Sequence, residues 1–112
     1  MTPVIEIRTY QLHEGAAERF HRTMQEQALV LLRASGSDVL AALPSLQEPS
    51  CYMLVRYYAS RAEREASQRA FYGSDAWING PRATIMACIA SYHTMVIDAQ
   101  EALRESMRSL CA

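Results

Sequence analysis

Residues 52–63 most strongly limit what this chain can fold into. The stretch 50–58 is rich in tyrosine, valine and leucine, a composition typical of a buried β-strand. It runs directly into Ser60-Arg61-Ala62-Glu63, whose spacing predicts the start of a helix over 61–72. The serine caps one backbone N–H there, and the glutamate reaches back to another. A strand joined to a helix by a very short turn is therefore the most clearly predicted unit of the fold.

The rest of the chain alternates between strand and helix patterns. Isoleucines at 5 and 7 on one face predict a strand over 4–12, and an apolar repeat near 3.6 residues predicts a helix over 16–34 that stops at Ser35-Gly36. We expect an edge strand over 37–45, because this stretch contains Pro44. We also expect a helical turn at 75–78, a helix over 81–88 and a strand over 89–97. A C-terminal helix should follow, starting with a second capping-box spacing, Asp98 to Glu101.

The order β-α-β-β-α-β is that of a split βαβ, or ferredoxin-like, arrangement. It predicts an α+β fold with a four-stranded antiparallel sheet, helices on one face, and strands 4–12 and 50–58 at the centre. A length of 112 residues fits a single domain. We expect a core over about 4–97 and the C-terminal helix over about 98–110.

Large apolar or aromatic side chains occupy both faces of the predicted strands. An exposed patch of that size is unusual on a monomer, so we expect a homodimer joined through the open face of the sheet. On the assumed alternation of side chains, Tyr52, Leu54 and Tyr92 are buried in that interface, and Tyr57 and His93 face the helices.

Several pieces of the sequence occur in an order found in one family. They are Glu6-Ile7-Arg8-Thr9-Tyr10, Arg56-Tyr57, Ser60 through Glu63-Arg64, and Trp77. Over residues 4–97 the chain resembles the NIPSNAP family of the dimeric α+β-barrel superfamily, and the C-terminal helix looks like an extension. The resemblance implies the fold and a dimer, but no established chemistry. Superfamily relatives, among them cofactor-independent oxygenases and small isomerases, tend to hold a pocket between sheet and helices.

Candidate site residues follow from that expected pocket. His93 and Tyr57 are candidate catalytic residues, because an imidazole titrates near neutral pH and a phenol can orient a ligand or act as an acid. Trp77 and His21 are candidate binding residues. For each of the four, packing in the core with a satisfied hydrogen bond is the alternative.

Arg8 and Tyr10 complete the candidate binding residues. Glu6, Arg8 and Arg56 fall on one strand face with Tyr10, and such a cluster suits an anionic ligand. Its alternative is an ion-pair network inside the barrel that balances buried charge and fixes the register of the dimer.

Composition excludes several classes of function. The net charge is −1 and the arginines are scattered, so we expect no nucleic-acid partner. No apolar stretch reaches the roughly 18 residues of a membrane span, and no signal peptide is visible, so we expect no membrane insertion and a cytoplasmic location. The three histidines and three cysteines lack metal-ligand spacing, and no phosphate-binding loop occurs. We expect no metal and no cofactor. Haem is disfavoured because no histidine lies between His21 and His93.

Two functions remain open. The first is to bind or transform a small apolar or aromatic molecule in a cleft between sheet and helices; an enzyme of this kind would be a cofactor-independent oxygenase or isomerase. The second is a non-catalytic homodimeric interaction module. A pocket with room for a ligand favours the first, and a closed core favours the second.

Overall fold

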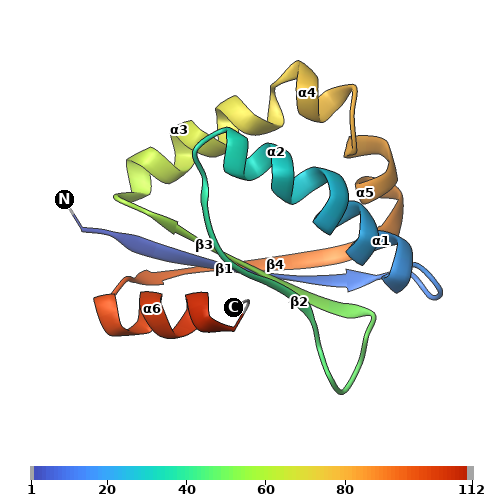
Figure 1. The fold of residues 1–112 in the computed structure, drawn as a ribbon, viewed down its shortest axis with the longest axis horizontal. Helices are drawn as coiled ribbons and strands as arrows, with labels where there is room; N and C mark the ends of the chain where they lie inside the picture. The colour runs from blue at the N-terminus through green and yellow to red at the C-terminus, as the bar shows by residue number, and fades with distance from the viewer. Residues whose placement is uncertain (1, 111–112) are drawn as a thin grey trace.

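The computed structural model describes residues 2–110 as one sheet with helices on both faces (Figure 1). The elements are β1 (Val4–Leu12), α1 (Ala17–Thr23), the π-helix η1 (Met24–Ala28), α2 (Leu29–Ala34), β2 (Asp38–Pro44), β3 (Cys51–Tyr58), α3 (Arg61–Tyr72), α4 (Asp75–Ile78), α5 (Arg82–Cys88), β4 (Ile89–Asp98) and α6 (Glu101–Ser109). The predicted α+β, ferredoxin-like element order is confirmed. Cys111 lies outside the described residues.

The sheet has the strand order β2-β3-β1-β4, and all neighbouring strands are antiparallel. The prediction that β1 and β3 are central and that the strand with Pro44 lies at an edge is confirmed. In the register, Glu6 lies opposite Arg56, and Tyr10 lies between Tyr52 and Tyr92. Because side chains alternate along a strand, these residues all point to one face.

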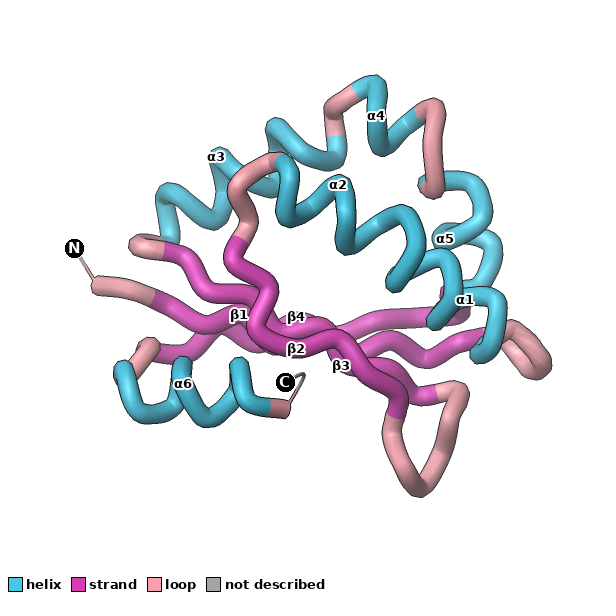
Figure 2. The backbone as a smooth tube through the Cα atoms, viewed as in Figure 1, coloured by secondary structure: helices cyan, strands magenta, loops and turns pink. Residues whose placement is uncertain are grey.

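That face is covered by α1 to α5. The helix formed by α1, η1 and α2 runs unbroken across the sheet, as Figure 2 shows. Phe20 is fully buried and packs against Tyr10 and Tyr52, with ring centroids 5.3 and 4.9 Å apart. The helix ends where Gly36 takes a positive φ of 95°, a backbone conformation that glycine adopts without steric penalty.

Two serine caps set where the later helices start. The backbone N–H of Glu63 donates to the hydroxyl of Ser60 over 3.1 Å, which starts α3 at the predicted position. In the same way the N–H of Trp77 donates to Ser74 over 3.3 Å. By contrast, no side-chain hydrogen bond from the described residues caps the start of α6 at Gln100, and Asp98 belongs to β4. The second capping box was therefore a wrong prediction.

The opposite face of the sheet carries α6, which corrects the expectation of helices on one face only (Figure 1). Leu103 and Met107 pack against a cluster that includes Ile5 and Val55. Arg104 and Arg108 both donate to Asp38, over 2.9 and 3.0 Å. Burial alone would raise the pKa of Asp38, but these hydrogen bonds and charges lower it.

The structure reverses the predicted assignment of the two sheet faces. Tyr52 and Leu54 are buried in the core under the helices, and Tyr92 lies on the same side, so none of them is on the open face. The sheet face that carries Glu6 and Arg56 can be buried under the helices, because α3 supplies hydrogen-bond and ion-pair partners for both residues. The aliphatic side, with Ile5, was left for the open face.

Candidate functional site

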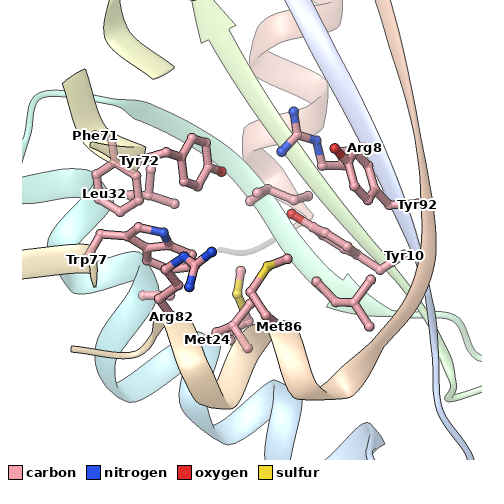
Figure 3. A pocket seen from close by; sticks show the side chains of 14 residues that line it. Arg8, Tyr10, Met24, Leu32, Phe71, Tyr72, Trp77, Arg82, Met86 and Tyr92 are labelled. Atoms are coloured by element: carbon pink, nitrogen blue, oxygen red, sulfur yellow. The ribbon is translucent and has the colours of Figure 1, made fainter. Parts of the chain in front are cut away.

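A pocket of about 320 Å³ lies between the sheet and the helices (Figure 3). Its volume is at the lower end of the range for small-molecule sites. The walls are mainly apolar and aromatic, with a few polar groups. Its lining residues are Arg8, Tyr10, Met24, Ala28, Leu32, Leu54, Phe71, Tyr72, Trp77, Arg82, Ile85, Met86, Ile89 and Tyr92.

Local irregularities of the helices shape this pocket. Met24 and Ala28, the first and last residues of the π-helix η1, both line it. Single π-helical turns within α-helices are frequent at functional sites, because the widened turn changes which side chains point inward. Ser74 and Asn79 cap the two ends of the short helix α4, which places Trp77 in the wall against Phe71 and Tyr72, at centroid distances of 5.4 Å each.

A buried ionic network adjoins the pocket. Glu6 and Arg56 are both fully buried, and Arg56 donates to Glu6 through Nε over 3.2 Å and through Nη2 over 2.5 Å. Arg64 donates to the other carboxylate oxygen over 2.6 Å, and Gln68 donates to it as well. Arg8 lies 3.7 Å from Glu6. One carboxylate thus faces three guanidiniums, a net charge of +2.

This network holds Glu6 ionised. Burial alone would raise the pKa of Glu6, but the charges of Arg56 and Arg8, with hydrogen bonds from Arg56 and Gln68, outweigh it and lower the pKa below the usual 4.5. Arg56 also donates through Nη1 to the hydroxyl of Tyr72 over 3.0 Å, which fixes that lining residue in place.

The polar groups of the pocket are hydrogen-bond donors and cations. Burial, followed by the influence of Tyr72, raises the pKa of Tyr10 to about 12, so its phenol stays protonated at neutral pH. Figure 3 places Arg8 and Tyr92 on one side and Trp77 and Arg82 on the other. None of the 14 lining residues is a carboxylate or a histidine.

Three of the predicted site residues line the pocket together, namely Arg8, Tyr10 and Trp77. His21 does not. Its Nδ1 lies 2.7 Å from the hydroxyl of Tyr52, and its side chain borders a separate surface hollow near Arg33. That contact gives His21 the structural hydrogen bond that was the alternative to a binding role.

The predicted positions of Tyr57 and His93 were wrong. Both residues lie on the open face, in register with Ile5 and Thr9. Tyr57 packs beneath Arg104, whose guanidinium carbon is 3.8 Å from the ring centroid, and His93 is exposed. The error follows from the reversed assignment of sheet faces, which carries every second side chain to the other side.

Sequence reasoning missed several residues of the site and its supports. Arg82 and Met86 line the pocket from α5, and Arg64 and Gln68 hold Glu6 from α3. Residues 64, 68 and 72 are four apart, so they share one face of α3. This spacing is visible in the sequence and indicates that α3 directs polar side chains toward the sheet.

Within residues 2–110 no three His, Cys, Asp or Glu side chains are grouped to hold a metal ion. None of the helices in that stretch has the length and apolar character to cross a membrane.

Comparisons with known proteins identify the fold. No protein-family model matches this sequence, and no curated protein matches it. Solved structures do. A NIPSNAP family protein from Agrobacterium tumefaciens strain C58 aligns with a TM-score of 0.80 and 14% identity, covering 89% of this chain and 88% of that one. An uncharacterized NIPSNAP-like domain protein from Burkholderia xenovorans gives 0.81 and 13%, covering 89% and 87%.

A more distant neighbour comes from Nitrosomonas europaea and is provisionally assigned as an antibiotic biosynthesis monooxygenase. It aligns with a TM-score of 0.69 and 15% identity, covering 89% of this chain and 92% of that one. These identities are low, so what they establish is the shared architecture. The resemblance read from the sequence is confirmed at that level: the chain has the fold of the NIPSNAP family proteins.

Proposed function

We propose that this protein binds a small, flat, largely apolar molecule in the pocket between its sheet and its helices. The observation that carries the proposal is the lining of this pocket. Other hollows on the described residues are as large or larger, at about 330, 430 and 500 Å³, but none of those three combines several aromatic rings with arginines. The walls of the proposed site combine aromatic rings with a few oriented donors, which is the usual composition of a small-molecule site.

Trp77 provides the most direct test of binding. We expect Trp77→Ala to lose any small molecule that the wild-type protein retains, because the variant removes an aromatic wall of the pocket. His93→Ala is the matched control, since His93 lies on the other face of the sheet. Native mass spectrometry of the purified proteins measures the retained mass. Loss in His93→Ala with retention in Trp77→Ala would move the site elsewhere.

A catalytic role is the more demanding version of the proposal. The monooxygenase assignment of one structural neighbour suggests it, but the pocket lining offers no ordinary base: Tyr10 keeps its proton at neutral pH, and Arg8 and Arg82 are cations. Chemistry of the oxygenase or isomerase type would therefore need a substrate that arrives already ionised or gives up its proton easily.

A homodimer joined through the open sheet face is the second part of the proposal. The face carries Ile5, Ile7 and Ile97, and α6 packs over part of this cluster. Met95, in register with Ile7, is 62% exposed on that face. Apolar surface left open beside a packed cluster favours a second copy of the chain as its cover.

Light scattering after size exclusion tests the dimer. At micromolar concentration the wild-type protein should have about twice the chain mass of 12.6 kDa. Met95→Arg should shift it toward a monomer, because the charge would be buried without a partner in the interface. Val30→Arg is the control, since Val30 is exposed on α2 above the opposite face. A monomeric wild-type protein would refute the dimer.

A further inference from the structure

The polar contacts of the pocket specify the charge of its occupant. The cavity has guanidinium groups on two sides and no acidic side chain in its lining. A neutral apolar ligand would gain nothing from this arrangement, and a cationic one would be repelled. We propose that the ligand carries a negative charge, as a carboxylate or an acidic phenol or enol on a ring system of one or two rings. This inference rests on the proposed binding function.

Arg8 is held as a ready anion binder. Its Nε donates to Thr94 over 3.1 Å and its Nη2 to Gln68 over 3.4 Å, so the guanidinium is oriented while Nη1 is used by neither bond. The ring of Tyr92 lies beneath it, with 5.1 Å from Cζ to the centroid. A preorganised guanidinium binds a carboxylate more strongly, because little side-chain entropy is lost on binding.

The charge of Arg8 is not cancelled by its neighbours. Glu6 is its nearest carboxylate, at 3.7 Å, but the same carboxylate binds Arg56 and Arg64 at shorter distances. The network therefore keeps a net charge of +2 beside the pocket. Because the surroundings are largely buried, this charge is screened less than a surface charge would be.

Arg82 adds positive charge at the other side. It lies on α5 beside the aromatic wall, is exposed to solvent, and forms no ion pair or side-chain hydrogen bond within residues 2–110. Arg19, Arg33, Arg61 and Arg69 also lack such partners among the described residues, so it is the place of Arg82 in the pocket lining that points to a role toward the occupant. Arg8 is more buried than Arg82, so we expect its charge to contribute more to the affinity for an anion.

The pocket volume limits the size of the ring system. A cavity of about 320 Å³ that must bury most of its ligand suits a bicyclic aromatic acid better than a molecule with four fused rings. Phe71, Tyr72 and Trp77 supply apolar surface for such a flat body.

A matched pair of probes tests the charge. 2-Naphthoate and 2-naphthamide have the same ring system and nearly the same shape, but only the first is an anion. Trp77 is the single tryptophan of the chain, so a ¹⁵N-labelled sample gives one indole N–H signal, which reports from the pocket wall. We expect naphthoate to shift this signal with a Kd roughly tenfold lower than that of naphthamide.

Three variants test which arginines cause the preference for naphthoate over naphthamide. Arg8→Gln should nearly abolish it, and Arg82→Gln should reduce it several-fold. Arg61→Gln should leave it unchanged, because Arg61 begins α3, roughly 15 Å along the helix from Phe71 and Tyr72. Should Arg8→Gln unfold the protein, Arg82→Gln still decides, because the side chain of Arg82 is exposed and forms no ion pair or side-chain hydrogen bond among the described residues.

The possible outcomes distinguish the charge preference of the ligand from the binding function of the pocket. Equal affinity for the two probes in the wild-type protein, or a preference of undiminished size in Arg82→Gln, would overturn the anionic ligand and leave the pocket as a site for neutral molecules. If neither probe moved the indole signal while the spectrum remained that of a folded protein, the binding function and its charge preference would both fall.

Discussion

Glu6→Gln is expected to destabilise the protein by about 3–5 kcal/mol, because it leaves the fully buried guanidinium of Arg56 without its counter-ion. The amide has nearly the shape of the carboxylate, so the loss measures charge and not volume. Folded domains are stable by only about 5–15 kcal/mol, so this single change removes a large share. Urea unfolding followed by circular dichroism provides the measurement.

Glu18→Gln is the matched control. Glu18 forms an ion pair with Arg22 at 3.7 Å on α1, and its side chain is 91% exposed. Exposed pairs contribute little, because water screens them and side-chain entropy opposes them. Equal unfolding midpoints for Glu6→Gln and the wild-type protein would show that the network carries no net stability.

The same substitution should change the acid sensitivity of the protein. The folded-state pKa of Glu6 is lowered from its usual 4.5, so the group stabilises the fold above that value. This contribution is lost as the pH falls through the lower folded-state pKa. The wild-type protein should therefore lose stability below about pH 4.5 more steeply than Glu6→Gln does.

The fold could be predicted closely from the sequence because local signals mark its boundaries. Ser60 starts α3, Gly36 ends the helix before β2, and Pro44 lies on an edge strand, each as a local interaction requires. Such signals act over a few residues, so a single sequence contains them. The π-helix η1 gave no such signal, because its widened turn depends on how that helix packs on the sheet.

The candidate site was only half predictable, because it depended on which face of the sheet lies under the helices. Both faces carried apolar side chains, so periodicity alone left that choice open. The charged residues Glu6 and Arg56 suggested the open face, yet Arg64, Gln68 and Tyr72 of α3 satisfy them under the helices. A correct assignment required matching polar groups between a strand and a helix about 60 residues apart.

Gly80→Ala should have the largest effect on the pocket among small substitutions. A Cβ at this position would clash with the backbone carbonyl oxygen of Ala76, and a backbone atom cannot rotate away as a side chain can. The turn between α4 and α5 would have to shift, and that turn sets the relative positions of Trp77 and Arg82.

We therefore expect Gly80→Ala to destabilise the protein by about 1–3 kcal/mol and to lower affinity for pocket ligands at least tenfold at a temperature where it is folded. Gly73→Ala is the graded comparison, because its Cβ would lie 3.0 Å from the carbonyl oxygen of Arg69 and needs only a small adjustment. Thermal unfolding and the indole N–H titration measure the two effects separately. Unchanged affinity in a destabilised Gly80→Ala would mean that the pocket does not depend on the geometry of this turn.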